Sequence, residues 1–142
     1  MPEHVVKLTA DGLNDDRKPL NGSRVLLLGV AYKKDIDDVR ESPALSIIDL
    51  LRAKGADVRY HDPYVKVVSF DDAHTIGDNR ASLTTVSLTD DELRQADCII
   101  IVTDHSDIDY QRVTNLASLI IDTRNALSTD LRRDSRARVI RL

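Results

Sequence analysis

Two lysines and an arginine follow a strongly apolar run near the start of the chain. The run 25–31 is too apolar to have a solvated face, which predicts a strand covered on both sides. Lys33-Lys34 and Arg40 come next, and Ser42-Pro43 is a typical helix start with serine as the cap. Backbone N–H groups at a helix start favour anions. The stretch 25–43 therefore predicts a site for a phosphate-bearing ligand.

Two further apolar runs also end in polar residues. The run 98–102 leads into Thr-Asp-His-Ser at 103–106, and the run 119–121 leads into Asp-Thr-Arg-Asn at 122–125. In a parallel sheet these strand ends lie at one edge, which is where open α/β sheets bind ligands. We expect any ligand chemistry at that edge.

Single residues at this edge leave alternatives open. Lys33 is either a ligand of a phosphate or sugar hydroxyl, or a solvated turn lysine. Arg124 either binds a phosphate or ribose, or pairs with Asp122 or another carboxylate at the edge. His61 and His105 are expected to be structural or solvent-facing. The four histidines and one cysteine lack ligand spacing, so no metal site is predicted.

The elements that must position these residues alternate between strand and helix. Helices are expected at 43–54, 89–96 and 109–116, and short strands at 58–60, 84–87 and 139–140. This order predicts an α/β fold of Rossmann-like type, with three layers, an open, mainly parallel sheet and helices on both faces. The stretch 64–82 is interpreted as loop, with an edge strand near Val65–Val68 as the alternative.

The two ends of the chain are interpreted separately. Residues 1–22 are expected to form an N-terminal connector arm, in which Asp11-Gly12 and Pro19 interrupt any longer helix, and residues 23–142 to form the α/β domain. Five arginines in the last eleven residues indicate a solvated basic terminus.

Composition excludes several classes of protein. A net charge of −4 with interspersed charges argues against a protein that coats nucleic acid. The single cysteine, Cys98, lies in an apolar run and is expected to be a buried thiol, which fits the cytoplasm. No stretch of about 18 apolar residues predicts a membrane span. Neither GxGxxG nor GxxxxGK[ST] is present, so ordinary NAD binding and a P-loop are unsupported.

One long motif resembles a known family. The run GVAYKKDIDDVRESPAL at 29–45 resembles the signature of the UDP-glucose/GDP-mannose dehydrogenase family, in its C-terminal UDP-sugar-binding domain. Shorter matches follow in the expected order at 54–63, 96–105 and 121–125, and the opening 2–23 is similar to the connector after the family's central helix. The resemblance covers nearly the whole chain.

The resemblance implies a function and roles for four residues. Family enzymes oxidise C6 of a nucleotide-sugar from alcohol to carboxylate in two NAD-dependent steps, through a thioester on a cysteine. By position in the motif, Lys33 is expected to reach the substrate, the main chain around Tyr32 to hold the uracil, and Arg124 to contact the nucleotide-sugar. Arg40 is expected to reach the NAD pyrophosphate.

Parts of the family pattern are missing. The N-terminal GxGxxG and the catalytic FGGxC segment are absent, and Cys98 is no substitute. The resemblance therefore implies a UDP-sugar-binding piece, inactive alone, with UDP-glucose, UDP-N-acetylglucosamine and UDP-N-acetylmannosamine all open. Its implied partners are the UDP-sugar, an N-terminal NAD-binding domain, a central dimerisation domain and hence a homo-oligomer, but neither nucleic acid nor membrane. The alternative is a non-catalytic regulatory or interaction module.

Overall fold

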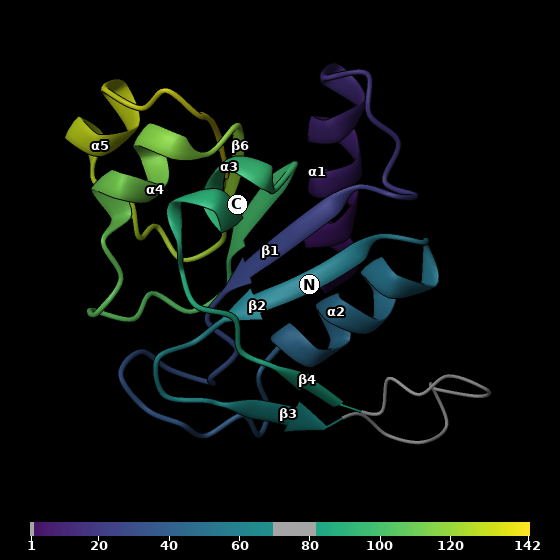
Figure 1. The fold of residues 1–142 in the computed structure, drawn as a ribbon, viewed down its shortest axis with the longest axis vertical. Coiled ribbons are helices and arrows are strands. Elements are labelled where there is room, and N and C mark those ends of the chain that lie inside the picture. The colour runs from purple at the N-terminus through teal and green to yellow at the C-terminus, as the bar shows by residue number, and fades with distance from the viewer. Residues whose placement is uncertain (1, 70–81) are drawn as a thin grey trace.

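A five-stranded, fully parallel sheet forms the centre of the computed structural model, which describes residues 2–69 and 82–142 (Figure 1). Its strand order is β2-β1-β5-β6-β7. The strands are β1 (Arg24–Leu28), β2 (Asp57–His61), β5 (Cys98–Ile101), β6 (Leu119–Asp122) and β7 (Arg138–Arg141). The strands expected at 25–31, 58–60, 98–102, 119–121 and 139–140 are confirmed, with slightly different ends.

The central strands are buried on both faces, as their apolar composition predicts. Every residue of β5 and β6 is buried, and alternate side chains enter two separate core clusters. Leu27 and Ile100 belong to one cluster, whereas Leu26 and Ile99 belong to the other. The period of two along each strand thus supplies a core on each side of the sheet.

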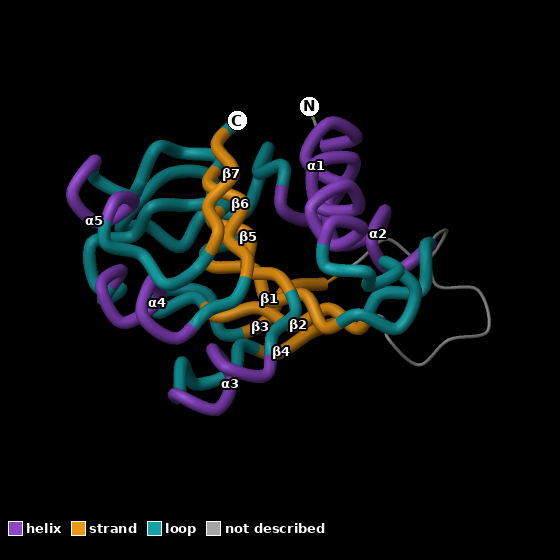
Figure 2. Tube along the Cα trace, turned by 90° about the horizontal axis from the view of Figure 1, so that it is seen from above, coloured by secondary structure: helices purple, strands orange, loops and turns teal. Residues whose placement is uncertain are grey.

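Helices cover both faces, which confirms the three-layer α/β prediction (Figure 2). Helices α1 (Pro2–Asp15) and α2 (Ala44–Ala53) lie on one face. Helices α3 (Asp90–Gln95), α4 (Tyr110–Leu116) and α5 (Thr129–Arg133) lie on the other. Thr89, Asp109 and Ser128 cap the N-termini of these last three helices with their side-chain oxygens.

The expected break at Asp11-Gly12 is wrong, because α1 continues through it to Asp15. A Cβ on Gly12 would lie 2.9 Å from a methyl carbon of Leu119 and 3.1 Å from one of Ile140. The glycine lets the helix approach the sheet closely, and this packing outweighs its low helix propensity. Residues 2–15 therefore contribute to the core.

Helix α2 begins one residue later than its sequence predicts. Pro43 occupies the cap position, and the Ser42 hydroxyl accepts a hydrogen bond from the Ala44 N–H at 3.2 Å. At the other end, Lys54 and Gly55 terminate the helix as expected. The predicted Ser-Pro start is thus correct in kind and shifted by one position.

A second, two-stranded sheet lies beside the first. Strands β3 (Val67–Ser69) and β4 (Ser82–Thr84) pair antiparallel. The strand expected at 84–87 overlaps β4 only at Thr84, because β4 ends there. β4 does not join the main sheet. The loop interpretation of 64–82 is wrong at 67–69, where β3 forms the edge strand that was its alternative. The part of the expected loop at 70–81 lies outside the described residues.

The basic C-terminal segment is structured, and four of its five arginines are exposed, as expected for a solvated basic terminus. It forms α5, which the sequence analysis did not predict, and β7 at the sheet edge. The Arg138 guanidinium donates to the Asp16 carboxylate at 2.9 Å and to the Gly12 carbonyl at 2.5 Å. The segment therefore links the end of the chain to α1.

The order of the strands reverses direction at the centre of the sheet. From β1 the chain moves outward to β2, and it later returns to β5 on the other side of β1 before continuing to β6 and β7. Ligands of open α/β sheets bind at the carboxyl ends of the strands where the order reverses. The loops after β1 and β5 flank this position.

Candidate functional site

The turn after β1 is fixed by contacts with both neighbouring strands. Gly29 has a φ of +86°, and a Cβ there would lie 2.5 Å from the Cβ of Thr103. Its N–H donates to the carbonyl of His61 at 2.9 Å. The Thr103 hydroxyl donates to the carbonyl of Ala31 at 2.6 Å. Only glycine fits this close approach, which fixes the start of the loop that follows.

Tyr32 and Lys33 begin an exposed loop, residues 32–38. The Tyr32 N–H donates to the carbonyl of Asp38 at 2.6 Å, which closes the base of the loop. The Lys33 ammonium lies 5.6 Å from the centre of the Tyr32 ring, within range of a cation–π contact. Among residues 2–69 and 82–142, no carboxylate pairs with Lys33. Within the described part of the chain, the Lys33 charge is therefore available to a ligand.

Arg40 is paired within its own loop. Its guanidinium binds the Asp38 carboxylate through two hydrogen bonds, of 3.0 and 2.9 Å, and its N–H donates to the same carboxylate at 2.9 Å. These bonds hold the pKa of Asp38 at about 2. The Arg40 side chain is 86% exposed and lines a shallow depression with Tyr32, Asp38 and Glu41. A phosphate bound by Arg40 would have to compete with Asp38.

Arg124 lies on a loop that a buried carboxylate organises. Asp122 accepts hydrogen bonds from the N–H groups of Arg124, Ala126 and Leu127, at 3.0 to 3.1 Å. The Arg124 side chain is 40% exposed, and its Nε lies 3.9 Å from the Asp104 carboxylate. Of the alternatives left open for Arg124, the structure shows pairing with another edge carboxylate, Asp104, and no ion pair with Asp122.

The structure brings the predicted residues to one edge of the sheet. β1, β5 and β6 are neighbours, so the loop of Lys33, the Asp104 carboxylate and Arg124 follow three adjacent strand ends. β1 and β6 are two strand spacings apart, about 10 Å at the backbone. That spacing suits a ligand with several phosphate or hydroxyl groups.

Both histidines singled out in the sequence hold backbone. His105 is fully buried, and its Nδ1 accepts a hydrogen bond from the Asp35 N–H at 2.8 Å. Its Nε2 lies 2.8 Å from the Asp62 carboxylate. The His61 Nδ1 lies 2.7 Å from the Val86 carbonyl. The structural interpretation of both is confirmed in these contacts.

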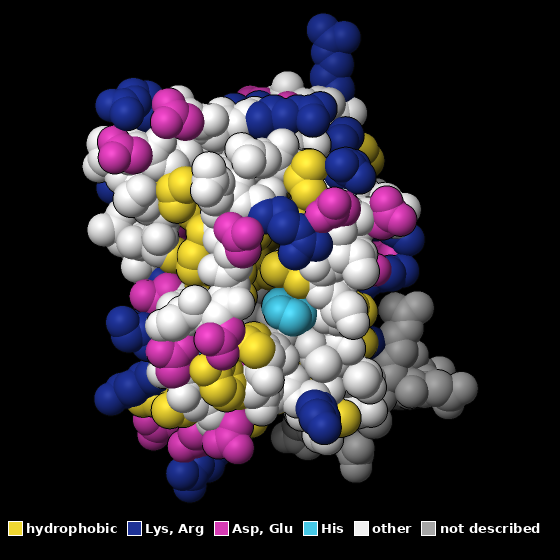
Figure 3. All heavy atoms as spheres, turned by 60° about the vertical axis from the view of Figure 1, so that its left-hand side comes forward, with side chains coloured by type: hydrophobic (Ala, Val, Ile, Leu, Met, Phe, Trp, Pro, Cys, Tyr) yellow, Lys and Arg dark blue, Asp and Glu magenta, His cyan; other side chains and the backbone are white. Residues whose placement is uncertain are grey.

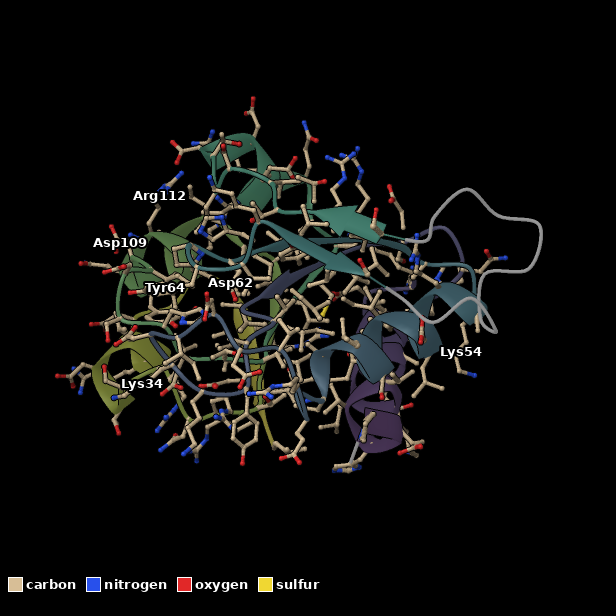
Figure 4. All side chains as sticks on the ribbon, turned by 90° about the horizontal axis from the view of Figure 1, so that it is seen from below. Lys34, Lys54, Asp62, Tyr64, Asp109 and Arg112 are labelled. Carbon is tan, nitrogen blue, oxygen red and sulfur yellow. The ribbon has the colours of Figure 1, made fainter. Side chains whose placement is uncertain are left out.

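Asp62 is the second buried carboxylate at this edge. In Figure 4 it lies beside Tyr64, well separated from Lys54. Its oxygens accept from the N–H groups of Val30, Tyr64 and Val65, at 2.8, 2.8 and 3.1 Å. Burial raises its pKa, but the hydrogen bond from His105 and those from the backbone lower it by more.

Other chemistry was also sought in the structure. Among residues 2–69 and 82–142, no three histidine, cysteine or acidic side chains gather to hold a metal ion. Cys98 is buried as predicted, and burial raises the pKa of its thiol. None of the helices described here is long and apolar enough to cross a membrane.

Comparison with known proteins identifies the family. Residues 26–129 match the model of the UDP-glucose/GDP-mannose dehydrogenase family, UDP binding domain. The chain belongs to this family. This UDP-binding domain is 33% identical over 137 residues to UDP-glucose 6-dehydrogenase of Rickettsia bellii. The alignment covers 91% of this chain and 29% of that protein. It is 27% identical over 139 residues to UDP-N-acetyl-D-mannosamine dehydrogenase of Methanococcus aeolicus, covering 92% of this chain and 28% of the relative.

A solved structure agrees with this assignment. The UDP-binding domain superposes on NDP-N-acetyl-D-galactosaminuronic acid dehydrogenase from Methanosarcina mazei with a TM-score of 0.75, at 28% identity, over 99% of this chain and 28% of that one. The chain thus spans less than a third of the length of these relatives.

Sequence analysis did not predict that Asp62 and Asp122 are buried and hold the loops of the UDP-binding domain through backbone N–H groups. Asp62 and Asp122 each stand at or just after the end of a strand, which is the one signal the sequence offered. Their role depends on which N–H groups the following loop brings within reach. That information exists only in the folded chain.

Proposed function

We propose that this chain is the UDP-sugar-binding domain of an NAD-dependent UDP-sugar 6-dehydrogenase, which oxidises the sugar C6 alcohol to a carboxylate. The carrying observation is the position of Lys33 and Arg124 at the carboxyl ends of β1 and β6, on either side of β5, beside the reversal of strand order. Within the described residues Lys33 has no carboxylate partner, and Arg124 is half-exposed. Two cations that follow strands about 10 Å apart at the backbone suit a nucleoside diphosphate and its sugar.

Each residue has a distinct role in this proposal. The main chain at Tyr32 holds the uracil, Lys33 reaches the substrate, and Arg124 contacts the nucleotide-sugar. Arg40 reaches the NAD pyrophosphate after it leaves Asp38. NAD itself binds mainly to an N-terminal domain that this sequence does not contain, and a central dimerisation domain makes the parent enzyme a homo-oligomer in the cytoplasm.

The chemistry belongs to the parent enzyme. This sequence contains neither the glycine-rich dinucleotide motif nor the cysteine motif of the family, so the domain binds substrate and does not turn it over alone. The relatives act, by their names, on UDP-glucose or UDP-N-acetyl-D-mannosamine, and the substrate of this chain is of the same UDP-sugar class.

Calorimetric titration with UDP, with AMP as the control nucleotide, tests the proposal. The Lys33→Ala/Arg124→Ala double variant removes both cations from exposed positions, so it is expected to fold and to lose UDP binding by about a hundredfold, as two charge-assisted contacts predict. A matched control, Lys54→Ala/Arg136→Ala, removes two exposed cations at the opposite end of the sheet.

The outcomes separate the proposal from its alternative. Saturable UDP binding that the site variant loses and the control variant keeps supports a nucleotide site at this edge. Absence of UDP binding at millimolar concentration, or equal loss in both double variants, contradicts it and favours the non-catalytic interaction module. A panel of UDP-glucose, UDP-N-acetylglucosamine and UDP-N-acetylmannosamine then ranks the sugars.

A further inference from the structure

A chain of hydrogen bonds links three strand ends to the loop 32–38. It begins at Asp62, after β2, whose carboxylate bonds the Val30 N–H and lies 2.8 Å from His105 Nε2. It passes through the His105 ring, after β5, to the N–H of Asp35 at 2.8 Å. The chain therefore crosses the position where the strand order reverses, beneath the loop that carries Lys33.

The direction of each hydrogen bond follows from the contacts. The Asp35 N–H can only donate, so His105 Nδ1 accepts and carries no proton. His105 is therefore the neutral tautomer with its proton on Nε2, which donates to Asp62. With His105, Val30, Tyr64 and Val65 as donors, both oxygens of the buried Asp62 carboxylate are fully used.

Asp35 is held in a backbone conformation that needs such support. Its φ is +62°, in the left-handed region that is unfavourable for residues other than glycine. Its carboxylate also accepts from the N–H and the hydroxyl of Ser106, both at 2.7 Å. These contacts from the β5 loop fix Asp35 on both sides of its Cα.

We propose that His105 is a positioning residue for the nucleotide site: through its hydrogen bond to the Asp35 N–H it holds the loop 32–38 in the conformation that presents Tyr32 and Lys33 to the ligand. The inference rests on the proposed function. Because the loop is exposed and closed at its base by one backbone bond, Tyr32 N–H to Asp38, its midpoint depends on His105 and Ser106. When the loop is already ordered before the ligand binds, less binding free energy is lost to ordering it.

Two substitutions at His105 separate its two hydrogen bonds. His105→Gln places an amide nitrogen near the position of Nε2, so it keeps the bond to Asp62 and loses the acceptor for the Asp35 N–H. His105→Asn places an amide oxygen near the position of Nδ1, so it keeps the acceptor and loses the bond to Asp62. His61→Gln is the matched control, because its ring holds the Val86 segment and does not contact the loop.

The experiment measures UDP affinity and amide hydrogen exchange of residues 32–38 in all variants. We expect His105→Gln to weaken UDP binding about tenfold and to speed exchange in the loop, whereas His105→Asn and His61→Gln stay within about threefold of the wild type in affinity even where they lower thermal stability. Ser106→Ala, at an exposed position, removes one bond to the Asp35 carboxylate and is expected to weaken binding about fivefold, which keeps the test decisive if a His105 variant does not fold.

Each outcome is decisive. If the wild type binds UDP and His105→Gln binds as tightly, the positioning role is wrong while the proposed function stands. If affinity falls equally in His105→Gln and His61→Gln, the effect is general destabilisation and the inference fails. If the wild type does not bind UDP, the proposed function fails, and the positioning of the loop is then supported only by faster exchange at 32–38 in His105→Gln than in His61→Gln.

Discussion

Asp62 and Asp122 hold the loops of the site, whereas the exposed cations on these loops are available to a ligand. Both carboxylates are buried at strand ends, and each accepts three backbone N–H groups from the loop that follows or adjoins it. A buried carboxylate satisfied in this way fixes a loop because every alternative loop conformation leaves it unpaired. The cations at Lys33 and Arg124 then stand on loops whose shape is already determined.

At the residue scale, sequence could select the cations and could not select their supports. Lys33, Arg40 and Arg124 are types that bind phosphate, and they stand in a motif whose family is known. Asp62 and His105 show no such signal, because their partners at Val30 and Asp35 lie far away along the chain. Which N–H groups a strand-end carboxylate reaches is decided by strand order.

Gly29→Ala is expected to destabilise the domain by about 3 kcal/mol, because it adds a steric conflict with Thr103 to an unfavourable positive φ. Gly22→Ala is the matched control: its φ is +84°, but a Cβ there meets no atom within 4 Å, so about 1 kcal/mol is expected. Urea denaturation of both variants measures the difference. Equal losses of stability in the two variants would show that the close approach of Gly29 to Thr103 does not add to the cost of the substitution.

At the element scale, sequence patterns located the main strands and failed where packing decides. The apolar runs at β1, β5 and β6 left little choice of structure. In contrast, α1 continues past Gly12 because the helix packs directly on Leu119. Helix propensity takes no account of such a tertiary contact. Helix α5 is only five residues long and has no buried residue, so its sequence has no amphipathic pattern to detect.

Leu13→Ala tests whether α1 is an integral part of the fold or a separable arm. Leu13 is fully buried in the cluster that also contains residues of α2 and the sheet, so a loss of about 2 to 5 kcal/mol in the free energy of unfolding is expected. Lys7→Ala, which removes only the exposed ion pair with Asp11, is expected to leave the free energy of unfolding nearly unchanged. A Leu13→Ala variant as stable as Lys7→Ala would support the original prediction of a connector arm.

At the scale of the whole molecule, the carboxyl edge of the sheet differs electrostatically from the rest. Acidic and basic side chains are interspersed over the face drawn in Figure 3, as the sequence predicts. At the carboxyl edge, however, several aspartates are held ionised by donors that the fold supplies. Hydrogen bonds from Ser106 lower the pKa of Asp35, and those from Arg40 hold the pKa of Asp38 at about 2. Asp62 has a lowered pKa as well.

These shifts predict acid destabilisation of the whole domain. Each carboxyl has a folded pKa below the ordinary value of 3.8, so in acid the unfolded chain takes up more protons than the folded one. The stabilisation is complete above about pH 5 and is lost as the pH falls from about 4 toward 2. Urea denaturation at pH 5, 4, 3 and 2.5 measures this change in the free energy of unfolding.

Salt distinguishes the contributions. At about 0.5 M it should weaken only the stabilisation from the exposed Asp38–Arg40 pair, because the buried N–H donors to Asp62 are not screened. A free energy of unfolding that stays constant from pH 5 to 2.5 would show that these hydrogen bonds do not favour the ionised carboxylates.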